Sequence, residues 1–212
     1  MTDRSGIIER GLVAALELAA DIPWSQLKLS EIAAKAEVPL SEFQGVGGKE
    51  ALADAVEGYF DREMSSEGVT NEGSPRERLF EAIMLRFEAM ETYRLGLLSL
   101  MKYRETSPSR LAHLVAARRR SAEWALVSAG LDDDAVAAKT LKVVAVGYVI
   151  AMTERAWRKE DSQDFTKTMS ALDRELRQVE EKLGWLKRFT GGAHSDTAPD
   201  EKEAGANGEE EK

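Results

Sequence analysis

Cysteine is absent from this 212-residue sequence, and histidine occurs only twice. The lack of cysteine excludes disulfide bonds, thiol catalysis and zinc sites built on thiolates. The two histidines, His113 and His194, are far apart in the chain and do not form a pair with the spacing that metal ligands need. We therefore expect no metal site and no cofactor.

Long apolar runs and phosphate-binding motifs are also missing. The most apolar segment, residues 143–152, is about half the length that a membrane span requires. Residues 1–8 carry charges and no apolar run, so we do not expect a signal peptide. The stretch GVGGK at 45–49 lacks the Gly-Lys-Ser/Thr ending of a phosphate-binding loop. Together these features predict a cytoplasmic protein.

Candidate catalytic residues are few. Asp161 and Asp164 could be read as an acid–base pair, but a solvated break before the helix that starts near Phe165 explains both of them. We therefore expect no catalytic site and no enzymatic activity.

What the sequence does contain is helical periodicity from end to end, with no convincing two-residue alternation. The pattern predicts an all-α fold of about nine helices. Pro23, Pro75, Pro108 and Gly130 mark breaks between them. We expect a three-helix head with its connecting helix at 1–64, a helical body at 65–189 and a disordered acidic tail at 190–212.

The charge of −9 is unevenly distributed. Residues 1–64 carry twelve acidic and six basic side chains, and the stretch 36–48 has two glutamates and no lysine or arginine. A nucleic-acid-binding element normally carries a basic surplus. The acidic head therefore leaves open an adaptor function in which it would contact a basic partner protein.

The stretch LSEIAAKAEVPLSEFQ at 29–44 has the pattern of a helix-turn-helix, and GGKEAL follows it at 47–52. Small alanines allow two short helices to cross closely, and a valine fills the turn. The combination resembles the TetR family of bacterial transcriptional regulators. The positions that match that family's pattern are Val38, Phe43, Lys49, Glu50 and Leu52. Glu37, Pro39 and Gln44 stand where the family has Gly, Ser and a second aromatic residue.

The resemblance implies a homodimer whose heads bind operator DNA. In the family, the residue matching Lys49 contacts a phosphate, assisted by the helix N-terminus. Base edges would be read by the helix after the turn, where glutamine can pair with adenine and glutamate can accept from cytosine. The expected DNA-binding residues are Lys28, Ser30, Leu40, Ser41, Glu42, Gln44 and Lys49.

The body contains apolar side chains that could enclose a ligand between helices, as the family resemblance implies. Methionine adapts readily to irregular ligands. The expected pocket residues are Phe87, Met90, Leu97, Met101, Tyr103, Trp124 and Tyr148. Any ligand would be mostly apolar, and Arg86, Lys102 or Arg104 could meet an anionic end. Ordinary core packing is the alternative explanation of these residues.

Two helices of the body predict a dimer interface. Residues 143–152 leave no polar face, and leucines and a valine at 172–186 recur at spacings of four and three, which is a heptad seam. The expected interface residues are Val143, Val146, Ile150, Leu172, Leu176, Val179 and Leu183. Trp185 and Phe189 beside Lys182, Lys187 and Arg188 would also suit a membrane surface. We favour the dimer, because the heptad seam already explains the apolar residues.

The segment 157–176, WRKEDSQDFTKTMSALDREL, resembles a second family, the coenzyme Q biosynthesis accessory protein. That family shares the TetR fold, binds isoprenoid lipids and does not read DNA. The leading hypothesis is therefore a homodimeric, TetR-like transcriptional regulator with an apolar effector. The alternative is a lipid-binding or isoprenoid-binding accessory protein whose head no longer binds DNA.

Overall fold

The computed structural model describes residues 4–66, 68, 72–132 and 136–191. In the segment 136–191, side chains are described for residues 138–182. The described part contains no strand. Its elements, in chain order, are α1 (Arg4–Leu18), η1 (Trp24–Gln26), α2 (Leu29–Lys35), α3 (Leu40–Val46), α4 (Gly48–Asp61), η2 (Arg62–Ser65), α5 (Pro75–Glu91), α6 (Arg94–Arg104), α7 (Pro108–Ser128), α8 (Val136–Trp157) and α9 (Thr166–Gly191). The predicted all-α fold with about nine helices is therefore confirmed.

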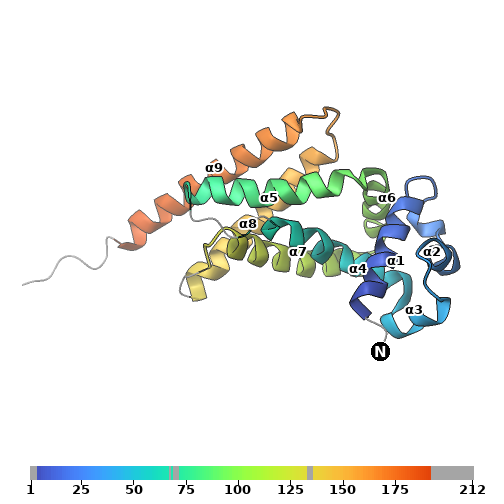
Figure 1. Ribbon diagram of the computed structural model, residues 1–212. Helices are drawn as coiled ribbons and strands as arrows, with labels where there is room; N and C mark the ends of the chain where they lie inside the picture. The colour runs from blue at the N-terminus through green and yellow to red at the C-terminus, as the bar shows by residue number, and fades with distance from the viewer. Residues whose placement is uncertain (1–3, 67, 69–71, 133–135, 192–212) are drawn as a thin grey trace, which may run out of the picture.

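The helices form a small head and an elongated body (Figure 1). In the head, α1 packs on α2, α3 and α4. In the body, α8 packs against α7 on one side and α9 on another, and α5 contacts α7, α8 and α9. α4 belongs to both parts, because it contacts α1 in the head and α7 in the body.

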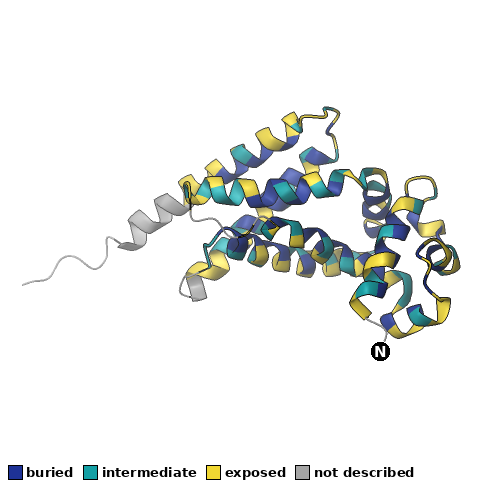
Figure 2. Cartoon of the chain, viewed as in Figure 1, coloured by how far each residue is buried: buried dark blue, intermediate teal, exposed yellow. Residues whose placement is uncertain are grey.

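One continuous apolar core runs through head and body (Figure 2). Its largest fully buried members include Phe43 and Phe60 in the head and Phe87 and Trp157 in the body. A second contact joins the two parts, where α6 and η1 meet. There the backbone N–H of Trp24 donates to Ser99 Oγ at 2.8 Å. The head is therefore docked on the body by side chains of both.

Local sequence signals explain where the body helices start. Ser74 and Glu77 form a reciprocal capping box at the start of α5, in which each side chain accepts a backbone N–H of the other residue, and Pro75 follows. At the start of α9, Glu160 accepts hydrogen bonds from both N–H and Oγ1 of Thr168, each at 2.9 Å. Burial alone would raise the pKa of Glu160, but the hydrogen bonds from Thr168 and Ser162 lower it to about 2.

Short local signals also set the ends of the head helices. Gly47, at a φ of 103°, is the one residue between α3 and α4, because Gly45 lies inside α3 and Gly48 begins α4. At the start of α2, the carboxylate of Glu31 accepts the N–H of Lys28 at 3.0 Å. The predicted tail at 190–212 lies outside the described residues from 192 onward.

Candidate DNA-binding head, ionic junction and body groove

The helix-turn-helix of the head is fully packed. Ile32 and Phe43 are completely buried, and Val38 closes the turn with its N–H donating to Ala33 O at 3.1 Å. Glu37 precedes it at a φ of 53°, in the left-handed region that glycine occupies at lower cost. A Cβ at Gly11 would lie 2.5 Å from the ring of Phe43, so α1 and α3 pack closely at this point. The fold of the motif is intact despite the unusual turn residue.

The expected base-reading residues lie at the surface of α3. Leu40 is 51% exposed, Ser41 and Gln44 are also exposed, and Glu42 is half-buried. These side chains are therefore placed where a DNA duplex could meet them.

Lys49 is placed differently. Its ammonium donates to Trp24 O and to Leu27 O, each at 3.1 Å, and lies 5.6 Å from the ring centroid of Tyr103. Two of its three donors thus bind the backbone around η1. The expected phosphate contact has to come from the remaining donor, and Lys49 has a structural role that the sequence did not indicate.

Other basic residues of the head also have carboxylate partners. Lys35 pairs with Glu17 at 3.0 Å, and Arg62 pairs with Glu9 at 3.1 Å. Lys28 and Ser30 are exposed at the start of α2. Among the expected DNA-binding residues, Lys28 is therefore the more accessible cation.

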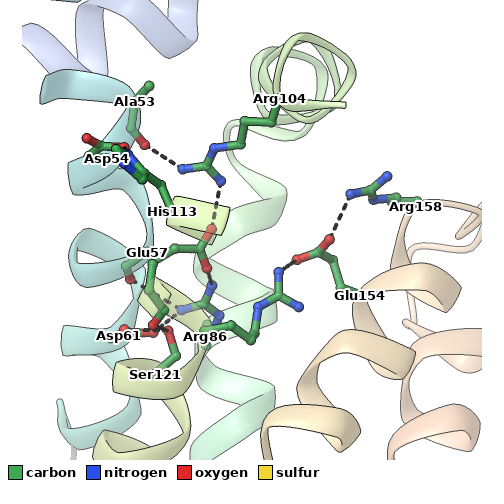
Figure 3. A network of polar contacts seen from close by, with 12 residues as sticks. Ala53, Asp54, Glu57, Asp61, Arg86, Arg104, His113, Ser121, Glu154 and Arg158 are labelled. Carbon is green, nitrogen blue, oxygen red and sulfur yellow. Dashed lines mark hydrogen bonds and ion pairs between the residues drawn. The ribbon is translucent and has the colours of Figure 1, made fainter. Parts of the chain in front are cut away.

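Charged side chains converge where α4 meets the body, and we call this cluster the ionic junction (Figure 3). Its members are Glu57 and Asp61 of α4, Arg86 of α5, Arg104 of α6 and Ser121 of α7.

Arg86, only 1% exposed, binds both Glu57 and Asp61. Arg104 holds the other oxygen of Glu57 at 2.8 Å, and Ser121 donates to Asp61 at 2.7 Å. The two carboxylates of α4 are thus tied to three body helices.

The junction changes the acidity of its members in opposite directions. Burial alone would raise the pKa of Glu57, but Arg86, Arg118 and Arg104 together lower it to about 2. Burial raises the pKa of Asp61, and Arg86 offsets this only in part. The structure also assigns Arg86 and Arg104 to these internal ion pairs, so neither is free to meet a ligand's anionic end, as the sequence had suggested. The third candidate, Lys102, is exposed.

A groove of about 1250 Å³ opens between α7 and α8, and we call it the body groove. Its apolar wall consists of Leu114, Val115, Val143, Val144, Gly147 and Ala151. It also has three acidic side chains, Glu123, Asp132 and Glu154, and five basic ones: Arg118, Arg119, Lys139, Arg155 and Arg158. The wall is therefore amphipathic, with more positive than negative charge.

Near one end of the body groove, Glu154 lies between two arginines. It binds Arg118 of α7, and its other oxygen accepts from Arg158 at 2.9 Å. Arg158 also binds Glu105, at 2.6 Å. Glu154 is 5% exposed, so its charge depends on these two partners.

None of the expected pocket residues lines the body groove. Phe87, Met90, Leu97 and Met101 are buried in the continuous core. Tyr103 donates to Glu50 at 2.5 Å and borders a second cavity of about 220 Å³ between α4 and α7.

The other two expected pocket residues, Trp124 and Tyr148, are about half exposed and border neither cavity. The sequence signal for the actual groove was the pair of small residues Gly147 and Ala151, which permit space or close packing equally well.

The expected dimer residues are used inside the chain. Those with described side chains form the contact between α8 and α9 or the core beside it: Val143, Val146, Ile150, Leu172 and Leu176 are buried, and Val179 is half-buried. The side chain of Leu183, like those of Trp185 and Phe189, lies outside the described residues. The heptad seam is thus explained by packing within one chain, and the interface they were expected to form stays a prediction.

α8 nevertheless exposes another apolar stripe. Leu141 and Tyr148 are 42% and 50% exposed, and Met152, one turn further on, is half-buried. Met169 of α9, a helix that packs on α8, is 38% exposed. Within one chain, this face of α8 is therefore left uncovered.

Within the part of the chain that the structure describes, no helix combines the length and apolar character that crossing a membrane takes. No cluster of three or more histidine or carboxylate side chains there is arranged to hold a metal ion.

Comparison with known proteins gives matches in structure only. No family model and no curated protein matches the sequence. A TetR transcriptional regulator from Nitrosomonas europaea superposes with a TM-score of 0.67 at 22% identity, covering 82% of this chain and 98% of its own. A TetR transcriptional regulator from Rhodococcus sp. RHA1 superposes with a TM-score of 0.62 at 16% identity, covering 86% and 99%. The chain therefore has the fold of TetR transcriptional regulators.

Proposed function

We propose that this protein is a homodimeric transcriptional regulator that binds operator DNA through its head and a small-molecule effector through its body. The observation that carries the proposal is the exposed reading surface of α3 on a fully packed helix-turn-helix. The fold likeness to two TetR transcriptional regulators supports the same conclusion. The protein would act without catalysing a reaction.

A dimer of this chain would use the apolar stripe of Leu141, Tyr148 and Met152 on α8, together with Met169 on α9. These side chains leave apolar surface in water, and burying it against a second copy would be favourable. Two heads held at a fixed separation could then meet successive turns of a palindromic operator.

The ionic junction offers a route from the effector to the head. α7 contributes Ser121 to the junction and Arg118 to the wall of the body groove, less than one helical turn apart. A ligand that displaces α7 would therefore act on Asp61 of α4, and through α4 on the position of the head. The effector would shift the DNA affinity by its different affinities for the two arrangements.

The test is binding of the purified protein to its own upstream DNA, measured by fluorescence anisotropy at two salt concentrations. We expect the affinity to fall steeply between roughly 50 mM and 200 mM salt, because phosphate contacts release counterions. Gln44→Ala in α3 should reduce the sequence-specific part of the affinity by about tenfold, since a bidentate base contact contributes about 1–3 kcal/mol. Gln178→Ala, an exposed change in α9, is the matched control and should have no effect.

If the protein binds no duplex DNA even at low salt, the regulator proposal is wrong and the lipid-binding alternative is favoured. The body groove and the paired cations of the head favour that alternative. It predicts that native mass spectrometry of the purified protein detects a bound isoprenoid lipid.

A further inference from the structure

We propose that the body groove binds a single-chain amphipathic anion, with a carboxylate or phosphate head at Arg118 and Arg158 and an alkyl chain along Ala151, Gly147 and Val144. The inference deepens the proposed effector site by naming a ligand class, and it stands whether or not the head binds DNA.

The site has an apolar side and a charged end. The apolar strip of the groove runs along α8 through Val144, Gly147 and Ala151, and Val115 of α7, 71% exposed, lies beside the charged end. A Cβ at Gly147 would come no closer than 3.7 Å to Ala122, so the wall is open at this glycine rather than filled. An alkyl chain covering this strip would remove apolar surface from water on both sides.

The charged end of the groove carries two guanidinium groups. Arg118 and Arg158 both line the groove and bind Glu154 and Glu105 through their terminal nitrogens. A carboxylate or phosphate can accept from guanidinium groups at two positions simultaneously, and such charge-assisted bonds are strong.

Glu154 already occupies the position of an anion in the groove. This carboxylate, 5% exposed, is contributed by the groove wall itself and is held by both arginines. An incoming anion would share or take over these donors. The groove thus has an internal competitor for the ligand, and removing the competitor's charge should strengthen anion binding.

The experiment is isothermal titration of the full chain, without DNA, with four ligands that share a twelve-carbon tail and stay below micelle formation. They are dodecanoate, monododecyl phosphate, dodecanol and dodecyltrimethylammonium. We expect the two anions to bind at least about tenfold more tightly than the neutral and cationic ligands, since hydrogen bonds to charged groups are stronger than those between neutral groups. Whichever anion binds more tightly identifies the head group as a carboxylate or a phosphate.

Two sets of variants locate the site. Glu154→Gln should tighten dodecanoate binding several-fold and leave dodecanol unchanged, whereas a merely structural ion pair would give a less stable protein with no gain in affinity. Val115→Lys and Val115→Glu change an exposed groove residue to opposite charges with little risk to folding. The lysine variant should bind dodecanoate more tightly than the glutamate variant.

Several results would overturn the inference. These are equal binding of all four ligands, no binding of any, or identical affinities in the two Val115 variants. Light scattering of the same samples measures the oligomeric state and gives one more such test. If Val115→Glu splits a dimer and the parent protein binds no ligand, a second copy of the chain covers the groove and the proposal fails. The DNA-binding assay gives an independent result in every case.

Discussion

Two of the contacts that join the head to the body differ in their chemistry. At one, α6 lies directly on α1, and a Cβ on Gly96 would collide with the backbone carbonyl of Leu16. At the other, the ionic junction ties α4 to α5, α6 and α7 through buried charges. The approach of Gly96 to Leu16 depends on shape, and the ionic junction depends on charge. The second can therefore respond to charge changes in the body that leave the first unaffected.

The largest expected effect is at the ionic junction. Arg86→Met would leave Glu57 and Asp61 buried without their main partner, and removing one member of a buried pair typically costs about 3–5 kcal/mol. Urea denaturation should show this loss. Arg119→Met, which removes a 74% exposed partner of Glu123, is the control and should cost less than about 1 kcal/mol.

If Arg86→Met does not fold, Arg86→Lys keeps the charge and tests the geometry. It should fold with a smaller loss, because lysine cannot bind both carboxylates as the planar guanidinium does. Equal stability of the two Arg86 variants and the parent would show that the junction contributes nothing.

Acid should weaken the ionic junction and leave the close contact at Gly96 unaffected. Glu57 has a pKa of about 2 when folded and 4.5 as its ordinary value, so its stabilisation is present above pH 4.5 and lost as the pH falls to 2. The loss is up to about 3 kcal/mol. Asp61 acts in the opposite direction, because burial raises its pKa, and it reduces the net effect.

The measurement is the free energy of unfolding of the parent and of Gly96→Ala between pH 7 and pH 2.5. Both should lose stability with nearly the same pH dependence, because no titrating group is part of the contact between Gly96 and Leu16. A steeper acid loss in Gly96→Ala would contradict the separation of the two contacts.

The close contact itself can be tested by adding one methyl group. Gly96→Ala forces α6 away from the carbonyl of Leu16, and overpacking of this kind costs about 1–3 kcal/mol or more. Gly58→Ala in α4 is a matched control, since its Cβ would meet nothing within 4 Å. Alanine is favoured over glycine inside a helix by up to about 1 kcal/mol, so the same substitution should stabilise there. Thermal denaturation should show a lower melting temperature for Gly96→Ala and a higher one for Gly58→Ala.

Lys49 and Lys28 separate structure from DNA binding within the head. Lys49→Met would leave the carbonyls of Trp24 and Leu27 without their donor, at a cost of about 1–2 kcal/mol in the free energy of unfolding. Lys28→Met removes an exposed cation and should leave stability unchanged but lower the salt dependence of DNA binding by about one unit. Lys49→Met should change that salt dependence less than Lys28→Met does. The opposite order would assign Lys49 mainly to phosphate.

The sequence predicted the features that repeat along the chain and missed those that join distant segments. Helical spacing accounts for the buried face of α4, where Leu52, Val56 and Phe60 recur every four residues. The pairing of Glu57 with Arg86 spans 29 positions and has no local pattern, so only the packing of α4 on α5 reveals it.

The lack of a local pattern for contacts between distant segments also explains why the expected pocket residues and the heptad seam lie in the interior of the chain. An apolar side chain at helical spacing, such as Phe87 or Leu172, looks alike in sequence whether it faces the core, a ligand or a second chain. In this structure both face the interior of one chain. The groove lies instead beside Gly147, where the absence of a side chain gives no periodic signal.

The smallest expected effect is at the turn of the head, where Glu37 stands in place of the glycine of the TetR pattern. Glu37 has a φ of 53°, and a left-handed conformation costs a non-glycine residue about 1–2 kcal/mol. Glu37→Gly removes that cost but adds the chain entropy of glycine, about 0.4–1 kcal/mol. The net gain in stability should be roughly 0.5 kcal/mol, which corresponds to a small rise in the melting temperature. DNA affinity should also rise, because a negative charge next to the reading helix is removed.

Glu37→Gln separates the two contributions. Glutamine removes the charge but keeps the conformational cost, so this variant should gain DNA affinity without gaining stability. If both variants gain stability equally, Glu37 lowers stability through repulsion among the carboxylates of the head and not through its backbone conformation. The pair therefore tests whether the charge or the backbone conformation of residue 37 limits the stability and DNA affinity of the head. The same distinction, between charge and shape, separates the ionic junction from the contact at Gly96.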